Sequence, residues 1–131
     1  MTTASVRAVD TVAALLDRVQ TYLDALYDGD VALFETVMHP TVRLHSATQP
    51  ELVSLSLQDY LEIVAGRVSP HSRGDRRRDR VLAVTMSSPT SAHVRVENAY
   101  PPKLFADDLV FTRTDGQWWI TSKTWHYTIE G

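Results

Sequence analysis

Apolar residues recur at helical spacing through the first part of the chain. Between Val12 and Asp28 they fall at every third or fourth position, so one side of a helix would be apolar and the other polar. Asp10 or Thr11 can cap the start of this helix, and Gly29 can supply the left-handed residue that ends it. The pattern therefore predicts an amphipathic helix with a single buried face.

Two further helices follow from the same spacing. Asp30 is a good N-cap for a second helix, and Pro40 stops it. Ser56 can cap a third helix, which Gly66 closes. The apolar face of this third helix consists of Leu57, Tyr60, Leu61 and Val64. We therefore expect three helices before the middle of the chain.

The segments around the third helix are shorter and more polar. Thr41–Ala47 alternates apolar and polar residues, which predicts a short strand, and Leu52–Leu55 is a candidate for a second one. Ser69–Arg80 contains Pro70, Gly74 and several arginines, and we expect a polar loop there.

The rest of the chain has the pattern of long strands joined by short turns. The four strand-like runs are Arg80–Met86, Ala92–Tyr100, Leu104–Thr114 and Trp118–Thr128. Asp115-Gly116 is a two-residue hairpin signal, and short turns between consecutive strands imply an antiparallel meander. Such a sheet must bury one face, and the three helices are the cover available. We therefore expect an α+β fold in which a curved, mostly antiparallel sheet closes over the helices around a cavity.

The composition fits one globular domain. The chain has 131 residues, of which 44% are hydrophobic and 22% are charged. We expect residues 1–10 to be a flexible N-terminus and residues 11–131 to form a single domain. No stretch approaches the roughly 18 apolar residues of a membrane span, and the first residues lack a signal-peptide pattern. We therefore expect a cytoplasmic protein with no membrane partner.

Charge and cysteine content argue against several classes of function. A net charge of -3 gives no electrostatic reason to expect a nucleic-acid partner. The arginines between Arg73 and Arg80 alternate with Asp75 and Asp79 and have no aromatic neighbours, which favours a solvated loop over a phosphate-binding one. The absence of Cys excludes disulfides and thiolate metal sites, and no two histidines have the spacing of helical metal ligands. We expect neither a metal nor a cofactor.

Several short motifs, taken in order, resemble those of nuclear transport factor 2-like domains, and in particular the bacterial subgroup labelled putative lumazine-binding. They are Tyr27–Asp30, Leu33-Phe34, His39–Val42, Ser69-Pro70, Arg73-Gly74, Asp79–Leu82, Asp115–Ile120 and Lys123, with Pro102, Phe105, Asp107 and Leu109 between them. The similarity covers about Val12 to Tyr127. It implies a cone-shaped α+β barrel and a homodimer packed through the outer sheet face. It implies little about activity, because the fold relatives include isomerases, dehydratases, polyketide cyclases and binding modules.

Strand alternation sorts the residues that can face the cavity. In the second long strand, Asn98 and Tyr100 share the inward face with apolar residues, and His93, Arg95 and Glu97 share the outward face. For the last strand the assignment stays open between two alternatives. A bulge can exchange the two faces part of the way along a strand, so either Trp125 or His126 can point inward.

Asp107 is the candidate catalytic acid or base. It is in phase with Phe105, Leu109 and Phe111, and a carboxyl group in an apolar cavity can transfer protons. The alternative is an aspartate at the start of a strand that stays in contact with water and binds a backbone amide. We favour that alternative for Asp107.

His45 and His126 are the candidate bases that would complete an acid–base pair with Asp107. The resemblance implies that the catalytic carboxylate of ketosteroid isomerase-type relatives would fall near Leu44. Leucine cannot take a proton, so that mechanism is not supported in its usual form. His45 is the next residue, but one step along a strand reverses the side chain, and we favour a surface histidine.

The candidate ligand-binding residues are mostly aromatic. Such rings can stack on a flat ligand such as a pterin or a flavin, and they are equally expected as core packing. The predicted set is Tyr22, Phe34, Met38, Tyr60, Asn98, Tyr100, Phe105, Trp118 and Trp125. We therefore favour a module that binds a small molecule. The alternatives are a cofactor-free isomerase, dehydratase or cyclase that uses the Asp/His pair in the same cavity, and an association domain that uses the outer sheet face.

Overall fold

A computed structural model describes residues 3–130, together with the side chains of residues 11–130. The helices are α1 (Thr3–Asp28), α2 (Val31–Val37), α3 (Leu57–Gly66) and α4 (Pro70–Arg73). The strands are β1 (Met38–Ser46), β2 (Val53–Leu55), β3 (Asp79–Ser88), β4 (Ser91–Tyr100), β5 (Lys103–Thr114) and β6 (Gln117–Ile129). The order of helices followed by a long meander agrees with the sequence pattern.

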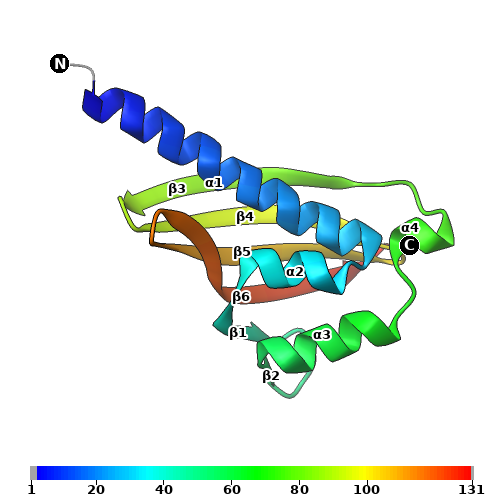
Figure 1. The fold of residues 1–131 in the computed structure, drawn as a ribbon. Helices are drawn as coiled ribbons and strands as arrows, with labels where there is room; N and C mark the ends of the chain where they lie inside the picture. The colour runs from blue at the N-terminus through cyan, green and yellow to red at the C-terminus, as the bar shows by residue number, and fades with distance from the viewer. Residues whose placement is uncertain (1–2, 131) are drawn as a thin grey trace.

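The strands form one six-stranded sheet in the order β2-β1-β6-β5-β4-β3. Consecutive strands from β3 to β6 pair antiparallel, as does β1 with β2, whereas β1 runs parallel to β6. Figure 1 shows α1 and α2 crossing one face of the curved sheet. The predicted α+β fold with a mostly antiparallel curved sheet is confirmed. The sheet stays unclosed, because β2 and β3 are its free edges.

The buried stripe of α1 is the one that the sequence predicts. Leu15, Val19, Tyr22 and Leu23 are all buried against the sheet and its neighbours. The helix begins at Thr3 rather than Val12, so Asp10 and Thr11 lie inside it and the predicted cap there is wrong. At the other end Gly29 adopts a positive φ of 64°, a conformation that glycine adopts without steric cost. The flexible segment 1–10 stays a prediction, because residues 1 and 2 and the side chains of 3–10 lie outside the description.

The junction between the second helix and the first strand differs from the sequence prediction. The second helix ends at Val37 instead of Pro40, because Met38 leaves the helix and pairs with Ile120 of β6. Pro40 then lies within β1, in the interval between Met38 and Arg43 where the pairing shifts register. A proline is tolerated there because no ladder hydrogen bond needs its missing N–H.

The expected loop 69–80 contains a short helix, α4. The Ser69 side chain accepts a hydrogen bond from the Ser72 amide, and Pro70 occupies the first turn, where its missing N–H is not needed. Gly74 ends the helix with a positive φ of 74°. The expected loop therefore includes one helical turn, which the cap, the proline and the glycine together specify.

The core lies between the helices and the inner face of the sheet. Its largest fully buried side chains are Trp118, Tyr22, Phe34 and Phe111. A reciprocal capping box between Ser56 and Asp59 fixes the start of α3, and the helix packs on this core through Tyr60, Leu61 and Val64. None of the helices within residues 3–130 is both long and apolar enough to cross a membrane.

Candidate functional site

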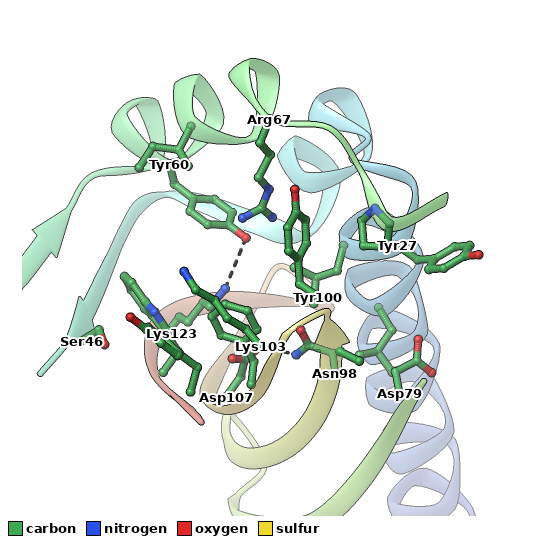
Figure 2. A pocket seen from close by; sticks show the side chains of 18 of the residues that line it. Tyr27, Ser46, Tyr60, Arg67, Asp79, Asn98, Tyr100, Lys103, Asp107 and Lys123 are labelled. Carbon is green, nitrogen blue, oxygen red and sulfur yellow. Dashed lines mark hydrogen bonds between the residues drawn. The ribbon is translucent and has the colours of Figure 1, made fainter. Parts of the chain in front are cut away.

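A cavity of about 250 Å³ lies where the C-terminal end of α1, the helix α3 and the sheet meet. Figure 2 shows side chains from all three parts converging on it. Five of the predicted ligand-binding residues line this space: Tyr60, Asn98, Tyr100, Phe105 and Trp125. Its volume lies slightly below the usual range for ligand sites. That space suits a compound of one or two rings.

The other four predicted ligand-binding residues do not line the cavity. Tyr22, Phe34, Met38 and Trp118 are buried in the core. Tyr22 and Phe34 pack edge to face with their ring centroids 6.1 Å apart, and this contact fills the space that a ligand would need. Strand and helix periodicity identifies inward-facing residues correctly here, but it does not distinguish packed residues from cavity-lining ones.

Asp107 is buried at the cavity wall, with 1% of its surface exposed. The Tyr22 hydroxyl donates a hydrogen bond to Asp107 Oδ2 at 2.6 Å, and Asn98 Nδ2 donates to the same oxygen at 2.8 Å. Within the described part of the chain, Asp107 Oδ1 has no hydrogen-bond partner. The interpretation that we favoured from the sequence, a hydrated aspartate bound to a backbone amide, is therefore wrong.

Tyr22 holds the Asp107 carboxyl group from the core side. Burial raises the pKa of the Tyr22 hydroxyl well above its usual value of 10, and the negative charge of Asp107 raises it further. The phenol consequently keeps its proton and remains a hydrogen-bond donor at neutral pH. Because Tyr22 and Asn98 both donate to Oδ2, they fix the orientation of the carboxyl group and leave Oδ1 without a partner among the described residues.

A bulge in β6 decides which of its side chains face the cavity. Val110 pairs with Ser122 and Phe111 with Ile120, so Thr121 is an extra residue on β6. Trp118 and Ile120 face inward before the bulge, and the opposite set faces inward after it. Of the two alternatives left open by the sequence, the structure selects the inward Trp125.

The same bulge buries Lys123, which sequence reasoning missed as a site residue. Only 5% of its surface is exposed. Its Nζ donates a 3.3 Å hydrogen bond to the Tyr60 hydroxyl and lies 4.6 Å from the centroid of that ring. The rings of Tyr22 and Trp125 are 5.3 and 5.6 Å from the same atom. The sequence signal was available: Lys123 shares a strand face with Trp125, so placing the tryptophan inward places the lysine there too.

The structure does not bring His45 or His126 together with Asp107. Trp125 is the register partner of Asp107, and His126 is that of Ala106, so the His126 side chain points to the opposite face. Its ring nitrogen lies 3.1 Å from the Thr48 hydroxyl. His45 follows the buried Leu44 and contacts the Ser54 hydroxyl at 3.1 Å. The predicted Asp/His acid–base pair is therefore not assembled, because a single step along a strand reverses each histidine.

The remaining charged side chains around the cavity fall into two groups. Arg77 pairs with Asp24 and Asp79, and Arg78 pairs with Glu130. Arg67 and Lys103 make cation–π contacts, at 5.1 Å with Tyr100 and 4.4 Å with Tyr127. Among the side chains of residues 11–130, no group of three His, Asp or Glu has a geometry that could hold a metal ion.

Comparison with known proteins gives a family and a fold. The profile of a family described as "Putative lumazine-binding" matches residues 10–126. Among curated proteins, no sequence matches the chain.

The similar solved structures share the fold at low sequence identity. An NTF2-like protein of unknown function from Silicibacter pomeroyi is 21% identical, with a TM-score of 0.77 over 92% of this chain and 98% of that one. A second NTF2-like protein of unknown function, from Shewanella baltica, is 14% identical, with a TM-score of 0.82 over 92% and 95%. A ketosteroid isomerase-like protein from Erwinia carotovora atroseptica is 12% identical, with a TM-score of 0.70 over 88% and 94%.

Proposed function

Because the chain belongs to the family described as "Putative lumazine-binding", we propose that it binds a small, flat ring compound in the cavity beside Asp107. The observation that carries this proposal is the aromatic-walled cavity that Asp107 borders, together with the buried Oδ1 atom of Asp107, which has no hydrogen-bond partner among the described residues. A buried carboxylate oxygen without a hydrogen bond is costly, and a ligand that donates an N–H or O–H group removes the cost. Ring compounds such as pterins carry such donors on a flat skeleton.

The walls of the cavity support the choice of a ring. Tyr60, Tyr100, Phe105, Trp125 and Tyr127 all border the cavity. Aromatic faces bind flat ligands through offset stacking and apolar contact, and the polar groups then fix the orientation. Here the orienting groups are Asp107, Asn98 and Lys123.

The binding proposal predicts that a cavity-filling substitution abolishes ligand binding without unfolding the protein. Leu55 is a partly buried β2 residue that borders the cavity, and Leu55→Trp would place a large ring in that space. We expect ring compounds, including pterins, to raise the melting temperature of the wild-type protein but not that of Leu55→Trp. Native mass spectrometry of the gently purified protein should detect a bound compound of low mass.

The matched control adds the same side chain away from the cavity. Val110 lies on the opposite face of the sheet and is 38% exposed, so Val110→Trp should bind like the wild-type protein. A wild-type protein that neither co-purifies with a compound nor responds to any ring in the panel would contradict the proposed function.

A second candidate function is a cofactor-free isomerase, dehydratase or cyclase. The observation that favours it is a buried carboxyl group that borders the same cavity as a buried ammonium group, that of Lys123. Asp107 would take a proton from the carbon next to a ligand carbonyl. The electron pair of that C–H bond would form a C=C bond as the π electrons of the carbonyl group move to its oxygen, where Lys123 would stabilise the enolate.

This second function can be tested by proton exchange on a bicyclic ketone. An enzyme of this kind should accelerate the exchange of the α-protons of 2-tetralone for solvent deuterium, and Asp107→Asn should lose the acceleration. If NMR shows that the wild-type protein does not accelerate this exchange, the enzymatic function is ruled out and ligand binding remains the proposed function.

We further propose that the outer sheet face forms a homodimer. Its polar centre consists of His93 and Arg95, which both donate to Asp108 Oδ1 at 3.0 Å, and the exposed Val110 lies beside them. Sedimentation at several concentrations should show a dimer that Val110→Lys weakens. A strictly monomeric species at every concentration would rule the dimer out.

A further inference from the structure

We infer, on the basis of the proposed function, that the ligand is an anionic ring compound whose carboxylate or other ionised oxygen is held by Lys123 and Arg67. Figure 2 shows these two side chains entering the cavity from different elements, Lys123 from β6 and Arg67 from the end of α3. The inference names the charge of the ligand, which neither the fold nor the family description gives.

The first step of the argument is a count of charges around the cavity. Its lining includes five cationic side chains and two carboxylates. Arg77 and Arg78 form ion pairs with three carboxylates, those of Asp24, Asp79 and Glu130, so this group carries one net negative charge. The other three cations, Arg67, Lys103 and Lys123, and the carboxylate of Asp107 leave a surplus of one positive charge when the two groups are added. The cavity is therefore positive in a chain whose net charge is -3, so its potential arises from local placement.

The second step is the environment of Lys123. Its ammonium group is buried, and its one hydrogen bond to the side chains described, those of residues 11–130, is to the neutral hydroxyl of Tyr60. None of the ion pairs of the described residues includes it. The faces of three aromatic rings offset part of the cost of burying the charge. An ammonium group has three donors, and an anion in the cavity would satisfy those that remain.

The third step is the second cation, Arg67. Its guanidinium group stacks on Tyr100 and makes no hydrogen bond or ion pair with the described residues. Its charge nevertheless acts inside the site, because it opposes the rise in the pKa of the buried Tyr22 hydroxyl. A planar guanidinium group with free donors binds a carboxylate through two parallel hydrogen bonds. Arg67 therefore supplies the geometry that a planar anionic group requires.

The fourth step is the direction in which the ligand lies. Asp107 borders the same cavity, and its negative charge repels an anionic group placed against it. The anionic end of the ligand therefore faces Lys123 and Arg67, and a neutral part of the ligand faces Asp107. This arrangement rejects a ligand that is anionic at both ends.

The experiment compares ring compounds that differ in charge but not in shape. Binding of 2-naphthoate and 2-naphthamide, and of benzoate and benzamide, is measured by calorimetry on the intact protein. We expect the wild-type protein to bind each carboxylate roughly 10- to 100-fold more tightly than its amide, as charge-assisted hydrogen bonds predict. Lys123→Met and Arg67→Met should each reduce this preference by about tenfold, because they weaken the binding of the carboxylates more than that of the amides.

Arg80→Met is the matched control, because it removes the same charge from the outer face, where Arg80 pairs with Glu97. It should keep the wild-type preference. Amides that bind the wild-type protein as tightly as the carboxylates would overturn the inference and leave the proposed function intact. If none of the four compounds binds, the inference and the proposed function both fail. The wild-type comparison decides the question even if Lys123→Met does not fold.

Discussion

Replacing Asp107 with alanine is expected to lower the free energy of unfolding by about 3–5 kcal/mol. The substitution removes the one acceptor of two buried donors, the Tyr22 hydroxyl and Asn98 Nδ2. Each buried donor that is left unpaired costs roughly 1–3 kcal/mol, and the small cavity left by the lost carboxyl group adds to the loss. Urea denaturation of the wild-type and variant proteins measures the difference.

The neighbouring residue provides the control for this prediction. The Asp108 side chain is 41% exposed and makes its ion pairs with His93 and Arg95 on the outer face. Such exposed pairs contribute about 0–1 kcal/mol, so Asp108→Ala should change stability much less than Asp107→Ala. Equal losses for the two variants would mean that the hydrogen bonds of Asp107 do not hold the wall of the cavity.

Raising the pH above about 10 is expected to destabilise the folded protein through Tyr22, with a slope of about 1.4 kcal/mol per pH unit. The pKa of Tyr22 is higher in the folded than in the unfolded state, because burial and the charge of Asp107 disfavour the phenolate. The unfolded chain therefore releases this proton first. The corresponding stability is fully present below the unfolded pKa, near 10, and is lost as the pH rises from there towards the folded pKa.

Tyr22→Phe separates this effect from other alkaline changes. The variant lacks the titrating hydroxyl. Above pH 10 its unfolding free energy should therefore fall less steeply with pH, by the contribution of one proton, about 1.4 kcal/mol per pH unit. At neutral pH it should also be less stable than the wild-type protein, because Asp107 loses a hydrogen bond. Chemical denaturation between pH 9 and pH 11 gives both quantities, and parallel curves for the two proteins would contradict the assignment.

Much of the fold follows from the sequence because its helices and strands have strong periodic patterns. The boundaries differ where a local rule competes with pairing across the sheet. Pro40 is a helix breaker, but the helix ends before it, because Met38 pairs with a residue of β6. At the start of the chain, the cap residues Asp10 and Thr11 were read as a boundary although the helix continues through them. Caps indicate where a helix can begin, and they do not exclude an earlier start.

The candidate site could be predicted in part. The prediction was limited by the question of which side chains of each strand face the cavity. Asp107 and Asn98 lie where alternation places them, but alternation does not reveal that Tyr22 would protect the carboxyl group from water. Lys123 was missed because it faces inward only after the bulge at Thr121, and the sequence left open whether Trp125, which shares its strand face, points inward. Contacts between distant segments, such as the one joining Lys123 to Tyr60, exist only once the sheet and α3 are packed.

The most direct test of this account is a crystal structure of the protein soaked with 2-naphthoate. We expect the ring to lie in the cavity of about 250 Å³, with its carboxylate within hydrogen-bond distance of Lys123 Nζ and directed away from Asp107. A cavity that holds only water at saturating ligand, or a ring bound with its carboxylate against Asp107, would contradict the account.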